Sequence, residues 1–114
     1  MAESVQPVLS IAQRDGEWCI RFNDRADPMC EIPADYDASL EGQFGPLCRL
    51  PGELRLFVDL SGVPAISSRQ LGILIAVQRI LRPRIERLPI RNAGPSVQRL
   101  LDVTRTDRFF EVQA

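Results

Sequence analysis

The chain has 114 residues, of which 45% are hydrophobic and 25% are charged, and its formal net charge is −1. This length and composition are typical of one globular domain with a core of its own. The chain contains no histidine. That removes the usual general base, the commonest metal ligand and every Ser-His or Cys-His catalytic arrangement. We therefore expect no catalytic activity, no metal and no cofactor.

Targeting and cysteine signals point to one compartment. No apolar run approaches the roughly 18 residues that span a bilayer. The first residues lack the basic start and the apolar stretch of a signal peptide. Cys19, Cys30 and Cys48 are odd in number and show no C-x-x-C spacing, which indicates reduced thiols and neither a disulfide framework nor a zinc site. We expect a cytoplasmic protein with no membrane span.

Charge is distributed unevenly along the chain. Residues 1–53 carry ten acids against four arginines, and residues 54–114 carry ten arginines against five acids. The basic charge of the second half suggests nucleic acid as a partner. A pI near 5.4 and the presence of only one Trp and one Tyr argue against such a partner. We expect no nucleic-acid partner, and complementary charges on two parts of one domain.

The first half contains a hairpin signal and then a long connection. Apolar segments at 8–13 and 18–22 flank Asp15-Gly16, a pair that favours a tight turn between antiparallel strands. Residues 23–53 are rich in proline, glycine and acids and keep no regular period. We predict an irregular connection with at most a short helix around 37–41. A connection of this length needs a function or packing of its own.

The second half alternates between strand and helix patterns. Residues 54–60 form an apolar run that predicts a central strand covered on both faces. A helix is predicted from Ser68 to Arg82, with a core stripe of Ile73, Leu74, Val77, Ile80 and Leu81. A short strand follows at 88–92, where Pro89 indicates a lost ladder bond or an edge position. Gly94-Pro95 opens a second helix, and 108–112 form a last strand or a short helix.

This order predicts an α/β domain in which a β-α-β-α unit with parallel strands follows the hairpin, on a mixed sheet of four to five strands. Asp59, Asp102 and Asp107 are the acids that a carboxylate site would draw on. No second motif supports acid–base chemistry, and Asp102 and Asp107 are typical of solvated helix ends.

Two segments resemble the STAS family, which includes the anti-sigma factor antagonists. The first runs through Val58-Asp59-Leu60-Ser61-Gly62-Val63, Ile66-Ser67-Ser68 and Leu71-Gly72-Ile73-Leu74. The second contains Ile90-Arg91-Asn92, Pro95, Val97, Arg99-Leu100-Leu101, Thr104, Asp107 and Phe109. Together they cover residues 54–112 with the family's order and spacing. Ser67, Arg69 and Gln70 stand where the family pattern has aspartate, serine and glycine.

The resemblance implies one STAS-like domain over residues 1–114 that regulates by binding a partner protein. In the best-known branch, the partner is an anti-sigma factor with serine kinase activity, which phosphorylates the serine at the start of the main helix and ends the complex. That serine falls on Ser68. The alternative is a divergent STAS scaffold without a phospho-switch, acting as a constitutive assembly module or a small-ligand binder. Whether the chain forms a homodimer stays open.

The two adjacent serines have different predicted roles. Ser67-Ser68-Arg69-Gln70 fits a capping box, with the Ser67 hydroxyl at the N-cap and Gln70 reaching back from N3. Ser68 then lies at N1, where a side chain can point to solvent. A phosphate there would sit at the positive end of the helix dipole without melting the helix.

The same helix predicts a partner-binding surface. Opposite the core stripe, one ridge is expected to face outward, and we expect partner contacts near the helix start and along this ridge. In the alternative, its apolar members lie under the long connection. The ridge consists of Leu71, Ile75, Gln78, Arg79 and Arg82, and the predicted contact residues are Ser67, Ser68, Arg69, Leu71, Ile75 and Arg79.

Overall fold

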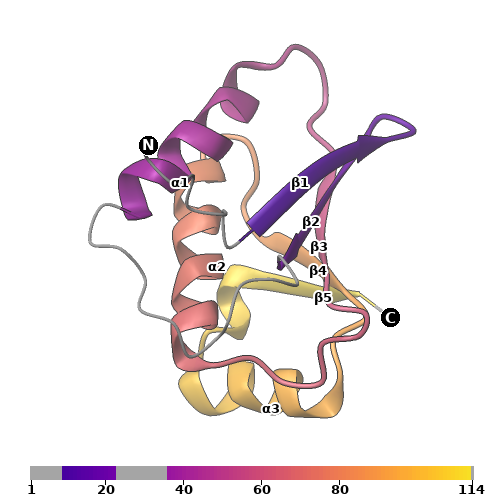
Figure 1. Cartoon of the computed structure of the whole chain (residues 1–114), viewed down its shortest axis with the longest axis vertical. Helices are drawn as coiled ribbons and strands as arrows, with labels where there is room; N and C mark the ends of the chain where they lie inside the picture. Colours follow the sequence, from indigo (N-terminus) through magenta and orange to yellow (C-terminus); the bar gives the residue numbers. More distant parts are fainter. Residues whose placement is uncertain (1–8, 23–35, 114) are drawn as a thin grey trace, which may run out of the picture.

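The computed structural model describes residues 9–22 and 36–113, which form a mixed sheet with helices packed against it (Figure 1). Within these residues the strands are β1 (Leu9–Arg14), β2 (Glu17–Phe22), β3 (Leu56–Asp59), β4 (Leu88–Arg91) and β5 (Phe110–Gln113). The helices are α1 (Tyr36–Phe44), α2 (Ser68–Leu81) and α3 (Pro95–Thr104), with short 3₁₀ turns η1 (Gly45–Arg49) and η2 (Asp107–Phe109). The five strands follow in the order β1-β2-β3-β4-β5. This confirms the hairpin followed by β-α-β-α, with a fifth strand at the end.

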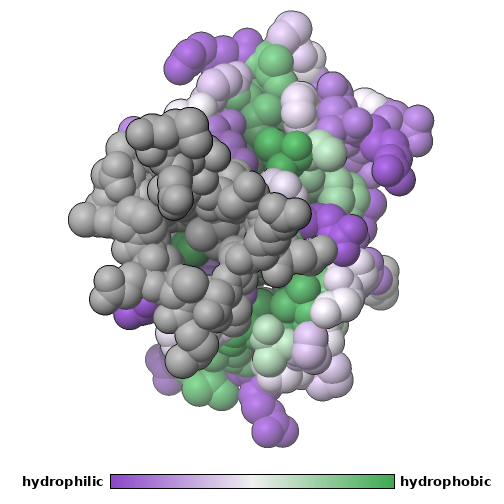
Figure 2. All heavy atoms as spheres, in the orientation of Figure 1, coloured by the Kyte–Doolittle hydropathy of each residue, from purple (hydrophilic) through white to green (hydrophobic). Residues whose placement is uncertain are grey.

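The hairpin has the predicted turn. Strands β1 and β2 pair antiparallel from Leu9↔Phe22 to Arg14↔Glu17, which leaves Asp15 and Gly16 as a two-residue loop. Their φ values are 55° and 77°, and a two-residue hairpin turn with both central φ angles positive matches the right-handed twist of its strands. In Figure 2, hydrophilic residues gather over the tip of this hairpin.

The sheet has one buried face and one open face. Strands β2 to β5 pair in parallel, and register partners share a face. The face toward the helices carries the core residues Leu9, Ile20, Phe22, Leu56, Val58, Leu88, Ile90 and Phe110, each at most 9% exposed. The opposite face carries the exposed Ser10, Ala12, Arg14, Arg21 and Glu111. On this face the β3 residues Phe57 and Asp59 are half-buried, so the expectation that β3 is buried on both faces is wrong.

Strand β4 lies inside the sheet. It pairs with β3 on one side and with β5 on the other, so the predicted edge position for Pro89 is wrong. The register between β3 and β4 begins at Ile90, one residue after Pro89. A proline has no N–H to donate to a ladder, and Pro89 has a register partner only on the β5 side, where it lies opposite Glu111.

The described part of the long connection packs against helix α2. Leu40 and Phe44 of α1 and Leu47 of η1 join the hydrophobic core, and α1 and η1 both contact α2. The Sγ atom of Cys48 lies 3.3 Å from the carbonyl oxygen of Ile80. Helix α1 is longer than the short helix predicted around 37–41, and residues 40–47 give the connection packing of its own. Residues 23–35 of the predicted connection lie outside the described residues.

Candidate partner-binding surface at the start of helix α2

Helix α2 begins with the predicted capping box. The backbone N–H of Gln70 donates to Ser67 Oγ at 3.1 Å, and the backbone N–H of Ser67 donates to Gln70 Oε1 at 2.7 Å. Ser67 has an extended backbone, with φ −82° and ψ 167°, as an N-cap residue requires. The role predicted for Ser67 as the helix cap is confirmed.

Ser68 is the first residue inside the helix and is exposed. Its hydroxyl takes no part in the cap, since the box uses only atoms of Ser67 and Gln70. The first turn of a helix carries N–H groups without intrahelical acceptors and a partial positive charge. A phosphate on Ser68 would therefore lie beside favourable charge and would leave the capping bonds intact.

The loop before α2 is held next to the loop before α3. Asp59 Oδ1 accepts hydrogen bonds from the backbone N–H of Ser61 and from Asn92 Nδ2, both at 2.9 Å. Gly94 approaches the carbonyl oxygen of Pro64, which would lie 3.9 Å from a Cβ at that position. The carboxyl ends of β3 and β4 thus lie beside the start of α2.

The Asp59 carboxylate is stabilised in its charged form. Burial raises its pKa, but the hydrogen bonds from Asn92 and Ser61, together with the charge of Arg21, outweigh burial and leave the pKa below its usual value. Asp102 and Asp107 are exposed on the α3 side of the molecule. Among residues 9–22 and 36–113, no three His, Cys, Asp or Glu side chains are grouped closely enough to hold a metal ion.

The outward ridge on α2 is only partly outward. Leu71 and Gln78 are buried, at 5% and 3% exposure, and Ile75 is half-buried against the core. For Leu71 and Ile75 the structure favours the alternative, in which they lie under the long connection, because α1 and η1 pack against α2. The outward position expected for Gln78 is wrong, since the helix buries a wider stripe than its core pattern indicated. Ser68, Arg69 and Arg79 are exposed, and Ser67 is half-buried.

The open sheet face carries an arginine network that the sequence did not reveal. Arg91 Nη1 and Nη2 lie 3.3 and 3.0 Å from the two Glu17 oxygens, and its Nε donates to Gln113 Oε1 at 2.9 Å. Its guanidinium also lies 3.9 Å from the ring centroid of Phe57. The Arg91–Glu17 pair joins the basic half of the chain to its acidic half, as their opposite charges predicted. The weaker pair Arg21–Asp59, at 3.9 Å, instead joins an arginine of the acidic half to an acid of the basic half.

A shallow hollow of about 410 Å³ lies on the open face and includes Cys19 in its wall. Burial and the charge of Asp59 raise the pKa of the Cys19 thiol, and Arg21, Arg14 and Arg91 only partly offset them. The thiol therefore stays protonated near neutral pH, and a protonated thiol is a poor nucleophile. Cys19 and Cys48 are free thiols, as predicted; Cys30 lies outside the described residues.

Comparison with known proteins defines the fold and nothing further. No family model matches the chain, and no curated protein matches it. Among solved structures, the chain is similar to the NMR structure of the protein TM1081, with a TM-score of 0.68 and 17% sequence identity, over 99% of this chain and 86% of that chain. No helix within the described residues is long and apolar enough to cross a membrane. The chain thus adopts a compact α/β fold that a distant sequence also adopts.

Proposed function

We propose that this chain is a STAS-like, non-catalytic cytoplasmic module that binds a regulatory protein, and that phosphorylation of Ser68 ends the binding. The observation that carries the proposal is the position of Ser68, which is exposed at N1 of α2 next to a separate capping residue. The residue resemblance over 54–112 selects the partner class, an anti-sigma factor with serine kinase activity.

Charge and geometry explain how a phosphate would act. Because Ser67 and Gln70 form the capping bonds, modification of Ser68 leaves the helix in place. A phosphoserine adds roughly −1.5 to −2 charge near pH 7. The partner then meets a bulky dianion at the helix start, and like-charge repulsion or desolvation of the phosphate disrupts the complex.

The remaining exposed contact residues lie on α2 with Ser68. Arg69 follows it directly, and Arg79 lies further along α2. Half-buried Ile75 offers apolar area between them, so that an apolar centre lies beside a polar rim, as protein interfaces commonly show. Leu71 is buried in the core and is therefore not part of this proposed contact surface.

Phosphate mapping tests the proposal. The protein is incubated with ATP and an anti-sigma serine kinase of the same organism, and the modified peptide is identified by mass spectrometry. Ser96 is a matched control, since it is also exposed and lies in the first turn of α3. We expect one phosphate on the wild type and on Ser96→Ala, and none on Ser68→Ala. Phosphate elsewhere, or none on the wild type, would overturn the switch and favour the scaffold without one.

A further inference from the structure

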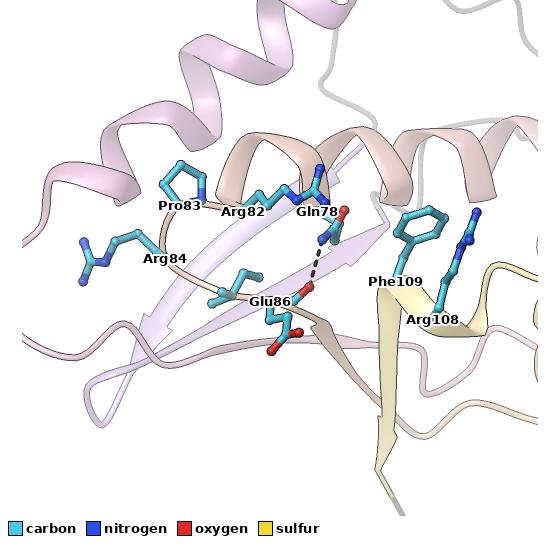
Figure 3. Close-up of a pocket in the computed structure, with 8 residues that line it drawn as sticks. Gln78, Arg82, Pro83, Arg84, Glu86, Arg108 and Phe109 are labelled. Atoms are coloured by element: carbon cyan, nitrogen blue, oxygen red, sulfur yellow. Dashed lines mark hydrogen bonds between the residues drawn. The ribbon is translucent and has the colours of Figure 1, made fainter.

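A second concave site lies at the far end of α2 from Ser68. It is a hollow of about 800 Å³ between the end of α2, the turn that follows it and η2 (Figure 3). Its wall includes Gln78, Arg82, Glu86, Arg108 and Phe109. A helix of 14 residues is about 21 Å long, which separates the hollow from the start of the helix. The volume falls within the range of about 300–1,000 Å³ that is typical of small-ligand sites.

Two arginines of this wall form no ion pair with the residues that the structure describes. Arg82 and Arg108 are exposed, and the ion pairs of the described residues involve neither of them. Arg108 lies with its guanidinium 5.0 Å from the ring centroid of Phe109, which places its charge beside a half-buried aromatic wall. A third arginine, Arg84, is occupied elsewhere, because it donates to carbonyl oxygens of residues 47–52 and turns away from the hollow in Figure 3.

A buried amide forms part of the floor. Gln78 is 3% exposed, and its Nε2 donates to the backbone oxygen of Glu86 at 3.0 Å (Figure 3). Within the described residues, its Oε1 accepts no hydrogen bond. A buried polar oxygen without a partner is costly, and a hydroxyl group of a ligand would satisfy it. The Glu86 carboxylate itself points away from Gln78 in Figure 3.

The end of a helix ordinarily repels anions, but most carbonyl groups here are already paired. The Leu81 oxygen accepts from the N–H groups of Arg84 and Ile85 at 2.8 and 2.9 Å, and the Arg79 oxygen accepts from the N–H of Arg82 at 3.4 Å. The Ile80 oxygen accepts from the Cys48 thiol. Because these bonds reduce the negative potential of the last turn, side chains set the charge of the wall, where the exposed Glu86 carboxylate offsets only one of the two arginines.

We propose that this hollow binds a small phosphate ester that carries hydroxyl groups. Arg82 and Arg108 would hold the phosphate, since a guanidinium offers paired donors that match its oxygens, and Gln78 would accept from a hydroxyl. The site is independent of the proposed switch at Ser68, so that a ligand here adds a second input to the domain.

Titration with ribose 5-phosphate tests the site, followed by NMR at the Nε–H signals of the arginines, with ribose as the ligand lacking phosphate. We expect both Arg82 and Arg108 signals to shift with ribose 5-phosphate and neither with ribose. Arg82→Gln and Arg108→Gln should each weaken binding at least about tenfold. Arg99→Gln is the matched control, because Arg99 is an exposed arginine of α3 that does not line the hollow, and it should leave binding unchanged.

Folding is checked by the urea midpoint of each variant, and Arg82→Lys, which keeps the charge, should retain part of the affinity. The site would be refuted if ribose 5-phosphate at about 10 mM left both arginine signals unmoved. Equal binding of ribose, or equal weakening by Arg99→Gln, would refute it as well. None of these readouts depends on Ser68 or on a partner protein, so failure here and failure of the switch are distinguishable.

Discussion

Replacing each serine of the 67–68 pair in turn should separate the helix cap from the proposed modification site. Ser67→Ala removes the acceptor of the Gln70 N–H, which lies at 3.1 Å in a partly buried setting. The loss of an N-cap side chain costs roughly 0.5–2 kcal/mol. The reciprocal bond from Ser67 N–H to Gln70 Oε1 uses the backbone and survives. We therefore expect a loss of about 1 kcal/mol in the free energy of unfolding, or about 4 °C in Tm for a chain of this size.

The control variants fix the interpretation. Ser67→Asp retains an acceptor and suits the helix dipole, so its stability should stay within about 0.5 kcal/mol of the wild type. Ser68→Ala should do the same, since the Ser68 hydroxyl makes no capping bond. Urea unfolding followed by the fluorescence of Trp18, the single tryptophan, measures all three. Equal losses for Ser67→Ala and Ser68→Ala would refute the division of roles.

Three further changes test the packing and the charges. Arg84→Ala removes four hydrogen bonds of 2.6–3.3 Å to carbonyl oxygens, which connect η1 and the residues after it to the turn after α2. We expect the free energy of unfolding in urea to fall by about 2–3 kcal/mol. A loss under about 0.5 kcal/mol would show that these bonds are dispensable. Leu71→Ala should lower the free energy of unfolding by about 2–5 kcal/mol because the side chain is 5% exposed. An unchanged stability would indicate that Leu71 lies on the outer surface. The pKa of Asp59 is lower in the folded protein than in the unfolded chain. The resulting stabilisation is fully present above the unfolded pKa of about 3.9 and is lost as the pH falls through the lower folded pKa. Asp59→Asn should therefore flatten the acid side of a curve of stability against pH, and an unchanged acid side would contradict the assigned hydrogen bonds.

Local signals in the sequence predicted the elements that depend on neighbouring residues. Asp15-Gly16 defined the hairpin because both residues accept positive φ, and the Ser67–Gln70 spacing defined the start of α2 because both bonds of the box lie within one turn. The alternation after residue 54 gave parallel strands joined by helices.

Features that depend on distant packing were beyond the sequence. Whether Leu71 faces solvent depends on where residues 36–49 fold back, and the irregular composition of that connection carried no periodicity to indicate it. The apolar run of β3 suggested two covered faces, yet Phe57 lies on the open face under Arg91. The network of Arg91 joins residues from four strands, Glu17, Phe57, Arg91 and Gln113, which no sequence spacing brings together. The Arg82–Arg108 hollow combines segments far apart in the chain for the same reason.

The affinity of Ser68→Glu for its partner tests the central claim most directly. The proposed partner is an anti-sigma factor with serine kinase activity from the same organism, and Ser96→Glu is the control for an added charge in the first turn of a helix. We predict that Ser68→Glu weakens the complex at least about tenfold, or about 1.4 kcal/mol, while Ser96→Glu binds like the wild type. Equal affinity for the wild type and Ser68→Glu would contradict a switch at this position.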